Sequence, residues 1–145
     1  MRKLIFALLV IALAGTLQAG DGKLMHCFYF TVIDGASDAD WQAFAEATDA
    51  LPGKIPGLLD VWHGKLRRPM SLASSNRETM QKLRGGEENV TGPVSLTTRQ
   101  HGVCMEMADE AALKTYADHT AHAEWVKVYE KVRKPGTTTV DIVGK

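Results

Sequence analysis

The sequence has no excess of charge of either sign, because 17 Lys and Arg residues balance 17 Asp and Glu residues. Proteins that bind nucleic acid through bulk electrostatics carry clustered basic residues, so the composition argues against that class. Only 2 of the 145 residues are cysteine, too few for a small domain built on a disulfide framework. The 45% of hydrophobic residues is typical of a folded chain, and the length matches one domain.

Apolar runs long enough to span a bilayer are also lacking, because the longest, residues 4–14, is about half the length that a transmembrane helix needs. Two basic residues precede this run and small residues follow it, which is the pattern of a secretory signal peptide. We predict cleavage after Ala19, so that residues 1–19 are the signal peptide and residues 20–145 the domain. The mature protein is expected to be exported, in a periplasm or secreted, with no stable membrane anchor.

The rest of the chain alternates between strand and helix patterns. Segments rich in aromatic and β-branched residues predict four strands, at 24–33, 58–66, 101–107 and 138–142. Ser37 with Asp40 predicts the start of one helix, and Asp109 predicts the start of a second, interrupted helix. The order βαββαβ predicts an α+β protein of the ferredoxin-like type, with an antiparallel sheet and both helices on one face.

A polar segment separates the two middle strands. Residues 67–98 are rich in Ser, Arg, Gly, Glu and Thr, which predicts a long inserted loop. Ser75 is a candidate cap for a short helix that ends at Gly85. Mixed charge without aromatic residues favours a solvated loop over a lid that recruits an anionic ligand.

The first strand, residues 24–33, does not alternate between apolar and polar residues. It therefore places large apolar side chains on both faces of the sheet, and the helices cover only one of them. The other face would expose an apolar patch too large for a monomer. We predict that a second copy covers it and that the protein is a homodimer.

Four short segments occur in the order and spacing of a known family. They are His26 with Phe28 and Phe30, then Ile55-Pro56-Gly57 with Val61 and Gly64, then His101, and finally Tyr116 to His122 followed by Trp125. Together they resemble the stress-responsive A/B barrel (Dabb) family of the dimeric α+β barrel superfamily, over most of residues 24–143. Thr120 stands where that family usually has proline, and the 67–98 segment is longer than the family's link.

The resemblance implies two functions of different classes. In the first, the protein is a homodimeric domain that binds a small apolar molecule or protects against stress, without established catalysis. In the alternative, it is an acid–base lyase or cyclase acting on a small apolar carbonyl compound. The family includes a plant polyketide cyclase whose acid–base pair matches Tyr116 and His122, so these are the catalytic candidates. A structural role for both residues at the helix break is the other interpretation.

Other residues are candidates for ligand binding, namely His26, His63, His119 and Trp125. No His-Glu-x-x-His motif and no cysteine pair at ligand spacing occurs, so we expect neither a metal site nor a cofactor, although axial haem ligation by a histidine stays open. Cys27 and Cys104 lie on strands that this topology makes neighbours. A disulfide between them is conceivable, but two buried free thiols are favoured.

Overall fold

The computed structural model describes residues 22–144, and the predicted signal peptide, residues 1–19, lies outside this range. In chain order the elements are β1 (Leu24–Val32), α1 (Asp38–Asp49), β2 (Leu58–Ser75), α2 (Arg77–Arg84), β3 (Val94–Met107), α3 (Glu110–Asp118), α4 (Thr120–Tyr129) and β4 (Arg133–Val143). Among the described residues, no helix is long and apolar enough to cross a membrane.

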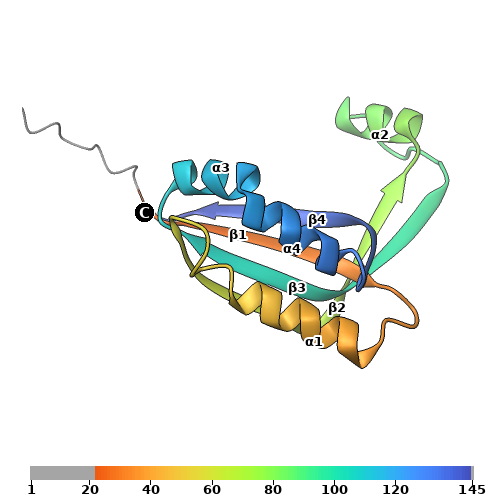
Figure 1. The fold of residues 1–145 in the computed structure, drawn as a ribbon. Coiled ribbons are helices and arrows are strands. Elements are labelled where there is room, and N and C mark those ends of the chain that lie inside the picture. The colour runs from red at the N-terminus through yellow and green to blue at the C-terminus, as the bar shows by residue number, and fades with distance from the viewer. Residues whose placement is uncertain (1–21, 145) are drawn as a thin grey trace, which may run out of the picture.

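The four strands form one antiparallel sheet in the order β2-β3-β1-β4, and α1, α3 and α4 lie on the same face of it (Figure 1). The predicted α+β, ferredoxin-like βαββαβ arrangement is therefore confirmed. The second helix is divided into α3 and α4, and the short helix predicted between the two middle strands is α2.

Helix α1 begins where the sequence predicts. The Ser37 hydroxyl accepts a hydrogen bond from the backbone N–H of Asp40, and the Asp40 carboxylate accepts one from the backbone N–H of Ser37. This reciprocal capping satisfies two N–H groups that the first helical turn cannot pair. Phe44 and Thr48, four residues apart, are the two buried residues of α1 and face the sheet side of the molecule.

The second helical segment is broken at His119. This residue has an extended backbone, with ψ of 140°, and its Nδ1 accepts a hydrogen bond of 3.1 Å from the N–H of Ala121. The predicted interruption is confirmed, and His119 caps the new helix, whose first residue is Thr120. Helix α4 then ends at Tyr129.

The predicted loop at 67–98 is wrong. Strands β2 and β3 continue as a pair from Met70 opposite Arg99 to Ser75 opposite Val94, and α2 crosses the tip (Figure 1). We call residues 67–98 the arm. It projects from the sheet beyond the helices, so its side chains do not show the alternation that a core imposes, and periodicity could not reveal its strands. Asn76, not Ser75, caps α2, which ends before Gly85 as predicted.

The register shows which side chains share a face, because directly paired residues point to the same side of a sheet. On the helix-covered face, Phe28, Phe30, Val103 and Met105 are at most 5% exposed and form the core with α1 and α4. On the other face, one row runs across all four strands through Trp62, Cys104, Cys27 and Val140.

We call this second side the open face. Trp62, Val140 and Ile142 are 56%, 43% and 57% exposed there. The ring of Tyr29 lies over Gly102, where a Cβ would come within 2.8 Å of the ring. The prediction that apolar side chains occupy both faces of the sheet is therefore confirmed.

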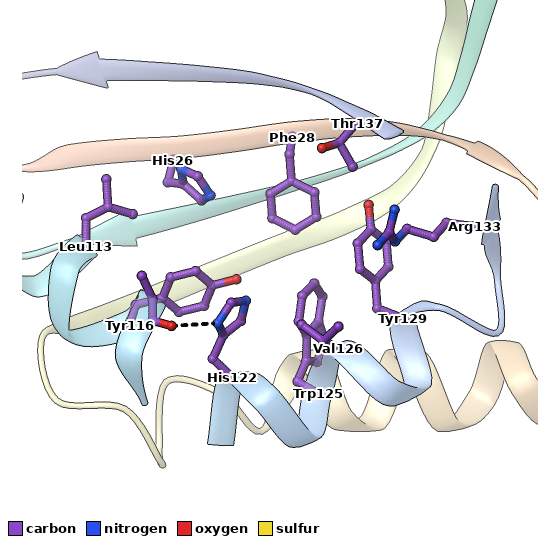
Figure 2. Close-up of a pocket in the computed structure, with 11 residues that line it drawn as sticks. His26, Phe28, Leu113, Tyr116, His122, Trp125, Val126, Tyr129, Arg133 and Thr137 are labelled. Carbon is purple, nitrogen blue, oxygen red and sulfur yellow. Dashed lines mark hydrogen bonds between the residues drawn. The ribbon is translucent and has the colours of Figure 1, made fainter. Parts of the chain in front are cut away.

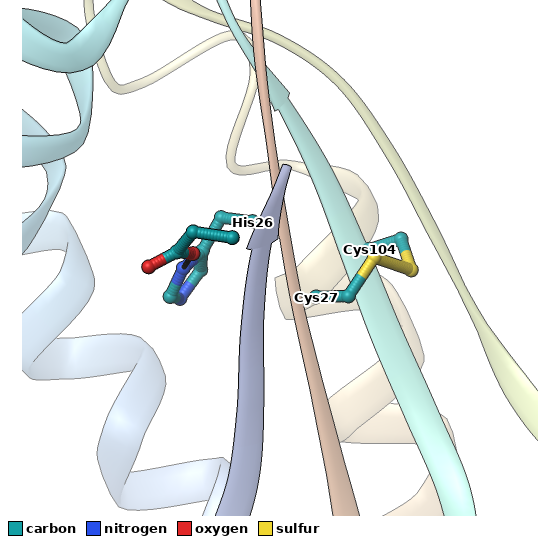
Figure 3. The surroundings of a disulfide bond; sticks show 4 residues. His26, Cys27 and Cys104 are labelled. Carbon is teal, nitrogen blue, oxygen red and sulfur yellow. Dashed lines mark hydrogen bonds and ion pairs between the residues drawn. A yellow bond between two sulfur atoms is a disulfide. The ribbon is translucent and has the colours of Figure 1, made fainter. Parts of the chain in front are cut away.

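Cys27 and Cys104 form a disulfide on the open face, so the prediction of two free thiols is wrong (Figure 3). They are direct partners in the β1–β3 register, with Cα atoms 4.1 Å apart. Two cysteines that face each other on adjacent strands are within bonding reach. The sequence identified the two strands but not the register, and only the register makes the two thiols face each other.

Candidate functional site

A pocket of about 440 Å³ lies between the sheet and the α3–α4 segment (Figure 2). It is lined by His26, Phe28, Leu113, Tyr116, Ala117, His122, Trp125, Val126, Tyr129, Arg133 and Thr137. The lining combines apolar walls with polar groups at two ends, as is usual for sites that bind small molecules. Three of the residues that the sequence singled out as ligand-binding or catalytic, His26, Tyr116 and His122, meet at one end.

The helix break brings Tyr116 and His122 together. Tyr116 lies in the last turns of α3 and His122 in the first turn of α4, and their ring centroids are 4.3 Å apart. Figure 2 shows the Tyr116 hydroxyl directed into the pocket beside the His122 ring. Because His119 redirects the chain between the two helices, both side chains face the same space.

One hydrogen bond determines which nitrogen of His122 is basic. Its Nδ1 lies 3.2 Å from the backbone oxygen of Ala117. A carbonyl oxygen can only accept, so Nδ1 carries the proton and donates it, and Nε2 of the neutral ring is left with the lone pair.

The surroundings set the protonation states of this pair. Burial lowers the pKa of His122, the nearby His26 lowers it further, and the bond to Ala117 opposes both. Burial also raises the pKa of Tyr116, with a further contribution from Tyr129. At neutral pH the site therefore combines a neutral imidazole with a protonated hydroxyl, a base beside a hydrogen-bond donor.

A second histidine faces the same end of the pocket. His26 and Asp141 are paired across β1 and β4, and Nδ1 of His26 lies 2.6 Å from a carboxylate oxygen of Asp141. The His26 ring is 5.9 Å from that of Tyr116. Sequence reasoning missed Asp141, although alternation along the last strand would have placed it on the face opposite Val140 and Ile142.

The other end of the pocket contains Tyr129, Arg133 and Thr137, none of which the sequence had suggested. Tyr129 is 5% exposed, and the Arg133 guanidinium lies 4.6 Å from its ring centroid. Among residues 22–144, neither the Tyr129 hydroxyl nor Nε of Arg133 has a hydrogen-bond partner. Burial raises the pKa of Tyr129, while Arg133 and Arg99 lower it.

A hydrogen bond to helix α1 fixes the aromatic wall between the two ends of the pocket. The indole N–H of Trp125 donates a hydrogen bond of 2.9 Å to the Thr48 hydroxyl in α1, and its ring stacks on that of Tyr129. Trp125, a candidate ligand-binding residue, therefore lines the pocket with an orientation that the core fixes.

Two candidate residues lie elsewhere. His63 is 3.0 Å from the Asp49 carboxylate and packs its ring against Phe44, and His119 caps α4. Neither lines the pocket, so their predicted roles in ligand binding gain no support from its geometry. Within the part of the chain that the structure describes, no three His, Cys, Asp or Glu residues form a group that could hold a metal ion.

Comparison with known proteins relates the chain to others through its fold. No protein-family model and no curated protein sequence matches it. Among solved structures, it is similar to a dimeric protein of unknown function with a ferredoxin-like fold from Bacteroides fragilis. That likeness has 18% identity and a TM-score of 0.55, and covers 85% of this chain and 97% of the other.

Two further solved structures are similar over the same region. A dabb family protein with a ferredoxin-like fold from Mesorhizobium loti shares 17% identity, with a TM-score of 0.55 and coverage of 86% and 98% of the two chains. A hydroxynitrile lyase from Passiflora edulis shares 9% identity, with a TM-score of 0.57 and coverage of 86% and 95%. The chain therefore has the ferredoxin-like fold of a group that includes a Dabb protein, and the predicted resemblance is confirmed for the fold.

Proposed function

We propose that the protein binds a small carbonyl compound in this pocket and transfers a proton to or from the carbon next to the carbonyl group. The observation that carries the proposal is the convergence of Tyr116 and His122 on a cavity of about 440 Å³. This convergence favours the interpretation of Tyr116 and His122 as an acid–base pair over the interpretation that both are purely structural.

His122 acts as the base in this proposal. Its Nε2 takes the proton from the carbon, and the electron pair of the broken C–H bond moves onto the carbonyl oxygen to form an enolate. The bond from Nδ1 to the Ala117 oxygen holds the ring in place and stabilises the imidazolium that forms. His26 with Asp141 supplies a second hydrogen-bonding group facing the same end.

Tyr116 acts as the donor to the developing enolate oxygen. Its raised pKa keeps the hydroxyl protonated at neutral pH. Phe28, Trp125 and Val126 give the pocket apolar walls, and an apolar environment strengthens a hydrogen bond to a charged oxygen. The same pair of groups serves an elimination or an aldol-type ring closure, the reaction classes of a lyase or a cyclase.

Proton exchange on a simple ketone tests the proposal. Phenylacetone is incubated with the protein in D₂O, and loss of its benzylic proton signal is followed by NMR. We expect exchange well above the buffer rate, a decrease of roughly a hundredfold or more in His122→Gln, and a smaller decrease in Tyr116→Phe. His63→Gln is the matched control, because this histidine pairs with Asp49 and does not line the pocket.

The alternative is a binding domain without catalysis. It predicts that phenylacetone binds, as judged by quenching of the tryptophan fluorescence, while exchange stays at the buffer rate. Equal exchange in the parent protein and in His122→Gln would exclude His122 as the base.

We further propose that the protein is an exported homodimer. Export is supported by the signal pattern of residues 1–19 and by the Cys27–Cys104 disulfide, since such bonds persist in oxidising compartments. Dimerisation through the open face is supported by its exposed apolar row and by the solved structure from Bacteroides fragilis, which is described as dimeric. Mass spectrometry of the mature chain tests export by showing where the signal peptide is cleaved. Light scattering tests dimerisation.

A further inference from the structure

The end of the pocket opposite His122 contains buried polar groups that have no partner. The Tyr129 hydroxyl and Nε of Arg133 are both without a hydrogen-bond partner among residues 22–144, and the Tyr129 side chain is almost wholly buried. Figure 2 shows the hydroxyl pointing toward Thr137 across the pocket. Because buried polar groups in native proteins are nearly always paired, a pair of unmet donors that line a cavity indicates a ligand that accepts hydrogen bonds.

The same end is positively charged. The nearest carboxylate to Arg133 is that of Glu130, at 3.5 Å and with a side chain 61% exposed. Arg99, itself 8% exposed, donates to the Thr138 hydroxyl at 3.2 Å and to the Gly136 oxygen at 3.1 Å, both neutral groups. At this end the Arg133 guanidinium therefore faces one largely exposed carboxylate, and Arg99 adds a second positive charge that acts on Tyr129, so a bound anion would balance the charge.

The opposite end differs in charge, because Asp141 stands there behind His26. Along α4, His122 and Tyr129 are two turns apart, which separates the two ends by roughly 10 Å. Apolar side chains, including Phe28 and Val126, fill the wall between them. A ligand that fits has an apolar middle, an anionic group at the Arg133 end and an uncharged group beside His122.

We propose that the ligand is an oxo acid whose carboxylate binds Arg133 and the Tyr129 hydroxyl, and whose ketone group lies beside Tyr116 and His122. This inference rests on the proposed function and specifies its substrate class. The carboxylate accepts one hydrogen bond from the Tyr129 hydroxyl and another from the Arg133 guanidinium, so that both unmet donors gain a partner.

A pair of probes of nearly equal shape tests the charge requirement. The mature protein is titrated with 7-oxooctanoate and with 7-oxooctanamide by calorimetry, at low and at high salt. We expect the carboxylate to bind roughly tenfold tighter or more, with an advantage that decreases as salt is added. Arg133→Met should remove that advantage, and Tyr129→Phe should reduce it severalfold.

Two controls separate binding from folding and from net charge. Tyr129→Phe removes only an unpaired hydroxyl, so its melting temperature should stay equal or rise while its affinity for 7-oxooctanoate falls. Lys134→Met loses the same charge as Arg133→Met, but Lys134 pairs with Asp34 and does not line the pocket, so it should bind both probes normally.

The outcomes distinguish this inference from the proposed function. Equal affinity for the two probes, or an equal loss in Lys134→Met and Arg133→Met, overturns the oxo-acid assignment and leaves proton exchange on phenylacetone standing. Proton exchange on phenylacetone without binding of either oxo compound also overturns the oxo-acid assignment and leaves the proposed function standing. Failure to exchange phenylacetone together with failure to bind either probe overturns both.

Discussion

The two faces of the sheet are formed by alternate residues of the same strands, yet they bury apolar surface in different ways. Phe28 and Phe30 point to the face that α1, α3 and α4 cover, and Tyr29, between them, points to the open face. On the covered face, the chain closes over its own core and leaves a pocket. On the open face, Trp62 and Val140 stay exposed on either side of a disulfide.

The difference separates two tasks. The covered face carries every polar group that lines the pocket, including His122 and Tyr129, because only there can two layers enclose a ligand. The open face exposes the apolar side chains of Trp62, Val140 and Ile142, as a face that associates with another protein should. One sheet thus supports a binding site on one side and a contact surface on the other.

The largest expected effect is on association through the open face. Trp62→Arg places a charge in the exposed apolar row of the proposed interface, twice in each homodimer, and should weaken dimerisation by roughly 5 kcal/mol. Sedimentation velocity should show a monomer at concentrations where the parent is dimeric. Leu83→Arg, at an exposed apolar position on α2, is the control and should leave the dimer intact. If Leu83→Arg dissociates the dimer and Trp62→Arg does not, the interface lies on the arm.

Neighbouring residues of β1 compare the two faces directly. Phe30 is 0% exposed in the core, so Phe30→Ala should lower the free energy of unfolding by roughly 4 kcal/mol. Tyr29→Ala removes a ring that lies over Gly102 on the open face, and should cost far less in the monomer. Urea denaturation measures both losses in the free energy of unfolding, and the Trp62→Arg background keeps the protein monomeric during the measurement. Equal losses would contradict the assignment of faces.

The disulfide is expected to contribute less than the core but more than any single surface contact. It closes a loop with a sequence separation of 77 residues, and replacing both Cys27 and Cys104 by alanine should lower the free energy of unfolding by roughly 3 kcal/mol. Reduction of the parent protein should have a similar effect, and the double variant should not respond to reductant. A stability insensitive to both treatments would exclude a structural role for this bond.

The smallest effect concerns pH and belongs to the covered face. Burial lowers the pKa of His101 and of His122 below 6.5, so the unfolded chain binds more protons than the folded one as the pH falls below that value. Stability should be complete above pH 6.5 and decrease as the pH falls toward the lower pKa values of the folded state. The urea midpoint measured across this range shows the slope, and His101→Phe with His122→Phe should reduce it.

Local patterns predicted the fold and half of the site. The capping of α1 by Ser37 and the break near His119 depend on contacts within a few residues, so the sequence alone revealed them. Tyr116 and His122 were found through the family resemblance. Asp141, Tyr129 and Arg133 were missed, because only strand register places Asp141 beside His26, and only the packing of α4 and β4 brings Tyr129 and Arg133 to the pocket.

The sequence by itself determined the order of strands and helices and the apolar character of both sheet faces, because these follow from periodicity and capping along a continuous stretch of chain. Only the tertiary structure decided that Cys27 meets Cys104, that His26 meets Asp141 across 115 residues, and that the arm is paired. Such contacts depend on which residues stand opposite each other in the sheet. A shift of one residue in register would reverse every side chain on a strand, so packing of the whole core selects the register.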